Sequence, residues 1–156
     1  MALETVSLEH LPNSHKVYFA LFRDVQNAAF LHQQLLARNP QFEYAFIDAS
    51  VIADAYRRYG ISPSTKDLIV VKVTFPGEDG VEPLTHDQIW EHLKTNVEGE
   101  ALSITDDQIS TTTDVPKVRK YYKLNGLKWI DDIQDEKVKQ KEIESLVIGA
   151  MALRGV

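Results

Sequence analysis

The chain has 156 residues, of which 44% are hydrophobic and 26% charged, values typical of a globular domain and not of an intrinsically disordered chain. Its 17 Lys and Arg against 23 Asp and Glu give a formal net charge of -6, which excludes a polycation that coats nucleic acid or anionic lipid. Cysteine is absent, which excludes a disulfide scaffold, a thiol nucleophile and thiolate metal ligands.

The first half of the sequence alternates between strand and helix patterns. Runs of β-branched and aromatic residues predict strands at 16–23, 42–47 and 67–75. Apolar residues at helical spacing predict helices at 27–38, 52–59 and 85–97. The last of these begins with Thr85 and Gln88 in the spacing of a capping box. This alternation predicts an α/β fold with a small mixed β-sheet flanked by helices.

The second half is predicted to be helical, completing a single domain over residues 1–156. Helical patterns occur at 105–110, 116–124 and 137–154, and Asn125-Gly126 ends the second. No run approaches the length of about 20 apolar residues that a membrane-spanning helix needs. The start of the chain lacks the basic and apolar regions of a signal peptide. We therefore expect a soluble intracellular protein that does not contact a membrane.

Recognisable catalytic motifs are absent from the sequence. The seven glycines form no G-x-G pair, and neither a P-loop nor a G-x-S-x-G turn occurs. His86 and His92 lie six residues apart, so they point to different sides of one predicted helix. The acidic residues at 131–136 fit either a Mg²⁺ site or a helix N-terminus. We expect no metal, no cofactor and no enzymatic activity; a hydrolase would have to depend on Asp131 or Asp132.

A basic stretch lies between two acidic regions. Residues 115–128 contain five cations and no acid, with Tyr121 and Tyr122 among them. Cations neutralise phosphates and aromatic rings stack on unpaired bases, so a nucleic-acid patch is one interpretation. A solvated helix with a core-facing apolar side is the other. The candidate nucleic-acid-binding residues are Lys117, Arg119, Lys120 and Lys123.

The predicted C-terminal helix is apolar around most of its circumference. One face carries positions 143, 147, 150 and 151, and Leu146, Ile148 and Leu153 extend the apolar surface around the helix. Such a helix is usually buried on all sides, which a small domain achieves with difficulty at its terminus. Two arrangements stay open: a central core helix, or a helix with one face on the core and one on another protein. The residue pattern favours a binding subunit over an enzyme.

Several short segments together resemble the PRPK-binding protein family, the small kinase-binding subunit of the KEOPS/EKC complex. They follow the family's order along most of the chain and look like its fungal branch. These segments are Ala20-Leu21-Phe22, Val25-Gln26-Asn27-Ala28, Ala45-Phe46-Ile47-Asp48, 53–61 (ADAYRRYGI), 68–73, Tyr122-Lys123-Leu124 and the ending Ala152-Leu153-Arg154-Gly155-Val156.

The resemblance implies a non-catalytic regulatory subunit that binds the atypical small protein kinase of the complex. Through the kinase it would support the catalytic threonylcarbamoyl-transfer subunit, which helps to make threonylcarbamoyladenosine on tRNA. The resemblance also implies a contact with the tRNA 3′ end, a link to telomere maintenance, and a location in nucleus and cytoplasm. An alternative function is a tRNA-binding module that acts through 117–128. Expected partner contacts are Ile148, Ala152, Leu153 and Arg154, with Ile52 and Ala55 as a second patch.

The chain departs from the family pattern after Asp48. A helix and a strand of the family, some dozens of residues by ordinary element lengths, are absent where the sequence runs directly into Ala53. Either the chain is a shorter splice form, or positions 51–53 join two segments without a true peptide bond. Loss of a strand exposes a sheet edge, which favours pairing with another chain, for example in an exchanged dimer.

Overall fold

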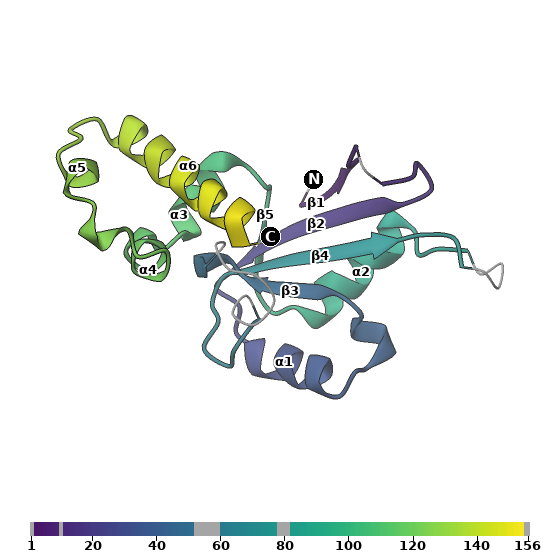
Figure 1. Ribbon diagram of the computed structural model, residues 1–156. Helices are drawn as coiled ribbons and strands as arrows, with labels where there is room; N and C mark the ends of the chain where they lie inside the picture. The colour runs from purple at the N-terminus through teal and green to yellow at the C-terminus, as the bar shows by residue number, and fades with distance from the viewer. Residues whose placement is uncertain (1, 10, 52–59, 78–81, 155–156) are drawn as a thin grey trace.

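The computed structural model describes residues 2–9, 11–51, 60–77 and 82–154, with only the backbone of Val51, Met151 and Arg154. Figure 1 shows a β-sheet with helices beside it and a separate group of helices at one end. The strands are β1 (Leu3–Val6), β2 (Lys16–Arg23), β3 (Ala45–Asp48), β4 (Leu68–Thr74) and β5 (Glu100–Leu102). The α-helices are α1 (Ala28–Leu36), α2 (His86–Asn96), α3 (Asp106–Thr112), α4 (Val115–Tyr121), α5 (Lys128–Asp131) and α6 (Glu136–Arg154). Short 3₁₀ helices are η1 (Pro40–Phe42), η2 (Ala49–Val51) and η3 (Leu124–Gly126).

The α/β class and the helical C-terminal half are confirmed, but the sheet is antiparallel rather than mixed. The strand order is β1-β2-β4-β3, and β5 also pairs with β2. All four pairs of hydrogen-bonded neighbours are antiparallel. Because β4 is antiparallel to both β2 and β3, the latter two run in the same direction, joined through α1. Strand β4 lies between the two, so they make no parallel contact, and this is why the sheet is not mixed.

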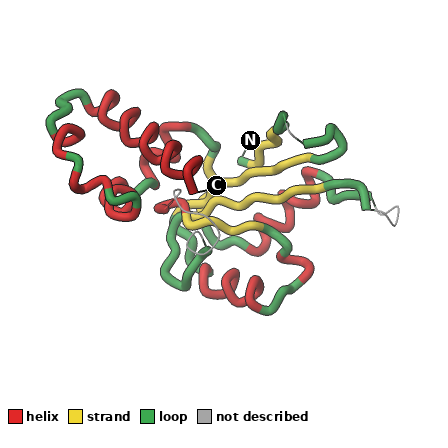
Figure 2. The backbone as a smooth tube through the Cα atoms, viewed as in Figure 1, coloured by secondary structure: helices red, strands yellow, loops and turns green. Residues whose placement is uncertain are grey.

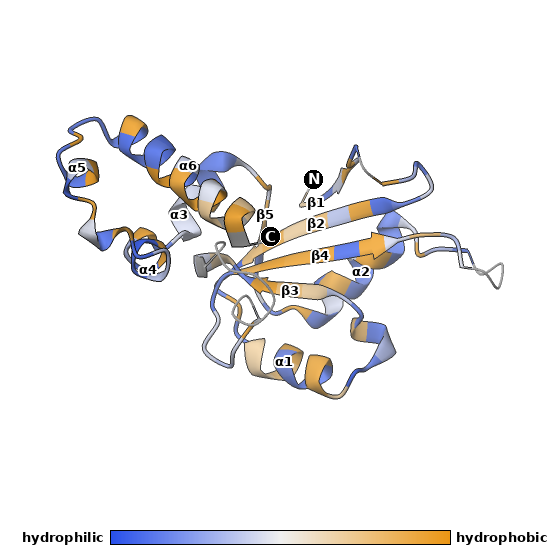
Figure 3. Cartoon of the chain, viewed as in Figure 1, coloured by the Kyte–Doolittle hydropathy of each residue, from blue (hydrophilic) through white to orange (hydrophobic). Residues whose placement is uncertain are grey.

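The main core lies between the sheet and two helices. Figures 1 and 2 show α2 behind the strands and α1 below them, and Figure 3 shows the strands largely in hydrophobic colours. Alternate residues of β2 (Tyr18, Ala20 and Phe22) share this core with Leu31 of α1 and Leu93 of α2. Helix α2 begins with the predicted capping box: Thr85 Oγ1 accepts from the Gln88 backbone N–H at 3.3 Å, and Gln88 Oε1 accepts from the Thr85 N–H at 2.9 Å.

A second apolar cluster holds the helical half together. It consists of buried side chains from the segment that runs from α4 to α6: Val118, Tyr122, Leu124, Ile130 and Ile143. The cluster is joined to the sheet half through polar contacts at the sheet end. Arg23 Nη2 donates to Thr111 Oγ1 at 2.5 Å, and the Asp114 backbone N–H donates to the Ser50 carbonyl at 3.2 Å. These contacts place α3 and α4 beside the end of β2.

One predicted strand is shorter than expected. The pattern at 42–47 predicts a strand from Phe42, whereas β3 begins at Ala45 and Phe42 closes the 3₁₀ turn η1. Asn39 Oδ1 accepts from the Gln41 backbone N–H at 3.1 Å, and Pro40 occupies the first turn. A proline and an Asx-type cap favour this turn over an extended chain. The helix predicted at 52–59 lies outside the described residues.

Candidate partner-binding surface

Helix α6 divides its apolar side chains between a packed face and an open face. The packed face consists of side chains in or against the second cluster: Ile143, Leu146, Val147 and Ala150. We call the side of α6 away from this packed face its open face. There Ile148, which is 65% exposed, lies one turn from the exposed Ala152, and Leu153, which is 79% exposed, lies further round the axis in the last turn. The helix is therefore not enclosed on all sides by the described part of this chain. An exposed apolar surface of this kind is typical of a protein-binding site.

The structure describes only some of the expected partner contacts. Ile148, Ala152 and Leu153 project from the open face of α6. Arg154 ends the helix, but its side chain lies outside the described residues. Ile52 and Ala55 also lie outside the described residues, so the second patch remains a prediction.

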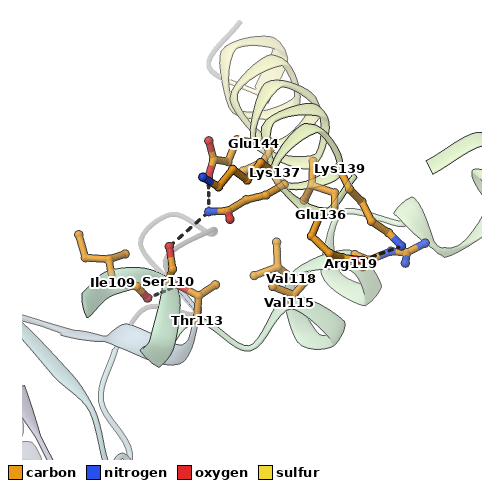
Figure 4. A pocket seen from close by; sticks show the side chains of 13 residues that line it. Ile109, Ser110, Thr113, Val115, Val118, Arg119, Glu136, Lys137, Lys139 and Glu144 are labelled. Atoms are coloured by element: carbon orange, nitrogen blue, oxygen red, sulfur yellow. Dashed lines mark hydrogen bonds and ion pairs between the residues drawn. The ribbon is translucent and has the colours of Figure 1, made fainter. Parts of the chain in front are cut away.

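A groove of about 410 Å³ lies between α3, α4 and α6 (Figure 4). Its apolar lining comes from all three helices: Ile109, Val115, Val118, Ile143 and Val147. Its charged lining residues are of both signs: Arg119, Glu136, Lys137, Lys139 and Glu144. Val115 is also an exposed apolar side chain, so the groove and the open face of α6 give the helical half two apolar surfaces. A groove with an apolar floor and charged edges suits an inserted side chain of a protein partner.

Hydrogen bonds cap the first turn of α6 and join this helix to α3. Asp135 precedes the helix, and its Oδ1 accepts from the backbone N–H groups of Lys137 at 2.9 Å and Val138 at 3.2 Å. Gln140 Nε2 donates to Ser110 Oγ of α3 at 3.3 Å and to Glu144 Oε1 at 2.9 Å, as Figure 4 shows. At the first turn of α6, Asp135 thus acts as the helix N-terminal acid that the sequence pattern allows.

The four candidate nucleic-acid residues do not form one free basic patch. Lys117 Nζ donates to Ser50 Oγ at 3.1 Å. Arg119 Nη1 lies 2.8 Å from Asp131 Oδ1, and hydrogen bonding to this guanidinium lowers the pKa of the Asp131 carboxyl. Lys120 and Lys123 are exposed. Two of the four cations therefore have a partner within the chain, although Lys117 is exposed like Lys120 and Lys123.

The histidines of α2 contact different regions, as their spacing predicts. His86 Nε2 donates to the Leu3 carbonyl at 3.1 Å, and this bond is the main reason that the pKa of His86 is raised. His92 Nδ1 lies 3.0 Å from the Tyr44 hydroxyl, and burial lowers the pKa of His92. Burial raises the pKa of Tyr44. Within the described ranges, no three His, Asp or Glu side chains gather as metal ligands do, and no helix is long and apolar enough to cross a membrane.

The groove is not evident from the sequence, because its walls come from segments that lie far apart in the chain. Ile109 and Val147 lie far apart in the chain, and only the tertiary structure brings α3 to α6. Local signals come from pairs one turn apart, Val115 and Val118 on α4 and 143 and 147 on α6, since this spacing marks an apolar helix face.

Comparison with known proteins identifies close relatives in fungi. The family described as "Kinase binding protein CGI-121" matches residues 22–55 and 50–155. A Gibberella zeae protein named "EKC/KEOPS complex subunit CGI121" is 71% identical over 197 residues, covering 100% of both chains. Proteins named in the same way are 40% identical over 207 residues in Neurospora crassa, with 100% of both chains covered, and 35% identical over 207 residues in Coccidioides immitis, with 98% of both covered.

These alignments are longer than the chain. The Gibberella alignment has 197 positions for 156 residues, which leaves about 41 positions without a residue of this chain. The family match is likewise divided in two, and its parts meet at residues 50–55.

Proposed function

Since the chain belongs to the CGI-121 kinase-binding family, we propose that it is a non-catalytic subunit of an EKC/KEOPS-type complex and binds the atypical small kinase of that complex. The observation that carries the proposal is the exposure of Ile148 and Leu153 on α6, a helix that packs in the second cluster through Ile143. Burying these two side chains against the kinase would contribute about 1.5–3 kcal/mol each.

The proposed role of the complex is threonylcarbamoyladenosine formation on tRNA, in nucleus and cytoplasm, with a link to telomere maintenance. In this role the chain supplies no reacting group; it binds the kinase and, through it, supports the catalytic subunit. The names of the fungal relatives support membership in the complex. We assign the contact with the tRNA 3′ end to Lys120 and Lys123, two of the exposed cations of the basic stretch.

Reconstitution tests the proposal. The full chain is mixed with the kinase and the other subunits from the same organism, and threonylcarbamoyladenosine on tRNA is measured by nucleoside mass spectrometry. We expect the chain to co-elute with the kinase and to raise the amount of modified nucleoside. Co-elution with none of the subunits would contradict the proposed role.

We further propose that the chain lacks a family segment at residues 50–55. The division of the family match and the 41 unfilled alignment positions support this proposal. Peptide mass mapping across residues 44–60 tests it. A single peptide with the mass of the given sequence means that the shorter chain is real, whereas additional residues between Asp48 and Gly60 would show that it is not.

A further inference from the structure

A second pocket, of about 450 Å³, lies where β1 and β2 meet the start of α2. None of its lining residues belongs to α3, α4 or α6, so it is distinct from the groove described above. Among the described residues that line it, Lys16 carries an ammonium group and Glu82 a carboxylate. The other polar lining residues are hydroxyl side chains and one histidine: Thr5, Ser14, Tyr18, Thr74, Thr85 and His86.

Tyr18 and Thr74 are buried residues, and within the described part of the chain their hydroxyl groups have no hydrogen-bond partner. Tyr18 is 4% exposed and Thr74 is 7% exposed. Among the described residues, nothing accepts from or donates to Tyr18 Oη or Thr74 Oγ1. The remaining buried threonines differ: Thr65 donates to Asp48 Oδ2 at 2.8 Å, and Thr112 donates to the Ile109 carbonyl at 2.9 Å. Both residues line the pocket, so a hydroxyl without a protein partner is free there to donate to solvent or to a bound group.

The strand register brings the polar groups to one side of the sheet. Lys16 and Thr74 are directly paired between β2 and β4, so their side chains lie on the same face. Tyr18 lies two residues along β2 and shares this face. Helix α2 begins at His86, in the pocket wall, so the positive end of its dipole lies at the same place. An ammonium group, two hydroxyl donors and a helix start together suit an acceptor with negative charge.

We propose that this pocket binds a small oxyanion, a phosphate or carboxylate group, through Lys16, Tyr18 and Thr74. Tyr18 Oη and Thr74 Oγ1 donate to the oxyanion oxygens, and the Lys16 ammonium neutralises the charge. The site is independent of the proposed kinase contact, because none of its residues lies on α6.

An NMR titration of the full chain tests this site. Inorganic phosphate and, separately, acetate are added at an ionic strength held constant with sodium chloride, and the backbone amides of Lys16, Thr74 and His86 are followed. We expect saturable shifts confined to the pocket for at least one of the two anions. Acetate binding alone assigns the site to carboxylates, and phosphate binding alone assigns it to phosphates. Shifts that increase linearly without saturation for both anions would overturn the proposal.

Three variants make the test specific. Tyr18→Phe and Thr74→Val each remove one hydroxyl with little change in shape, and each should weaken binding about tenfold. Both should fold at least as well as the parent, because the hydroxyl that they remove has no partner. Thr112→Val, which removes a paired buried hydroxyl outside the pocket, should leave anion binding unchanged. Lys16→Met, at an exposed position, should also weaken binding; unchanged affinity in all the pocket variants would refute the site.

Discussion

Replacing Ile130 by Ala tests whether the helical half depends on its own core. Ile130 is fully buried in the second cluster, beside Val118 and Ile143. The substitution removes three carbon atoms, which corresponds to about 2.4 kcal/mol at about 0.8 kcal/mol per methylene. The cavity that remains adds to this loss, so we expect the free energy of unfolding to fall by about 3–4 kcal/mol.

Denaturant unfolding and amide hydrogen exchange measure this effect. Amides of α4 and α6 should lose protection in the Ile130→Ala variant, while amides of β2 and β4, which pack in the other cluster, should keep most of theirs. Ile148→Ala is the matched control, because the same atoms are removed from an exposed position on the same half of the molecule; it should cost less than about 0.5 kcal/mol. A loss below about 1 kcal/mol for Ile130→Ala would refute the assigned cluster.

Three further predictions concern a helix cap, a glycine and a histidine. Thr85→Ala should destabilise the protein by about 1 kcal/mol in denaturant unfolding, since it removes the N-cap of α2; an equal loss in Thr95→Ala, in the last turn of this helix, would contradict a capping role. Gly99→Ala should lower the melting temperature, because a Cβ at residue 99 would lie 2.9 Å from the Arg23 carbonyl oxygen. Gly149→Ala should raise the melting temperature, because open space surrounds residue 149 and alanine favours the helix more than glycine does. The pKa of His92 is lowered by burial and by the Lys72 charge, so as the pH falls below 6.5 the unfolded chain takes up the proton first and stability decreases. Urea midpoints at pH 7 and about pH 5 should therefore differ less in His92→Gln than in the parent, and an equal difference would contradict the assignment.

Sequence patterns predict the longer elements well because their signals are local. The strand predicted at 16–23 coincides with β2, and the capping pair Thr85 and Gln88 marks the start of α2 correctly. Strands β1 and β5, of four and three residues, were missed because such short segments show too little alternation to be recognised. The direction of strand pairing depends on the insertion of β4, a long-range event that no local pattern encodes.

The candidate surface could be predicted only in part. The sequence indicates a helix at 137–154 with too much apolar surface for one small core, and α6 has that open face. Periodicity alone cannot decide which side is covered when apolar residues surround the helix. Likewise, the partners of Lys117 and Arg119 are Ser50 and Asp131, and only the structure brings Ser50 to Lys117.

Co-purification of the Ile148→Glu variant with the kinase tests directly whether the open face of α6 is the kinase contact. Because Ile148 is 65% exposed, the substitution should leave the melting temperature nearly unchanged while the buried charge abolishes kinase binding. Leu36→Glu is the control: it places the same charge at a 71% exposed apolar position on α1 and should bind the kinase normally. Kinase binding by Ile148→Glu at the level of Leu36→Glu would contradict the claim that the open face of α6 is the kinase contact.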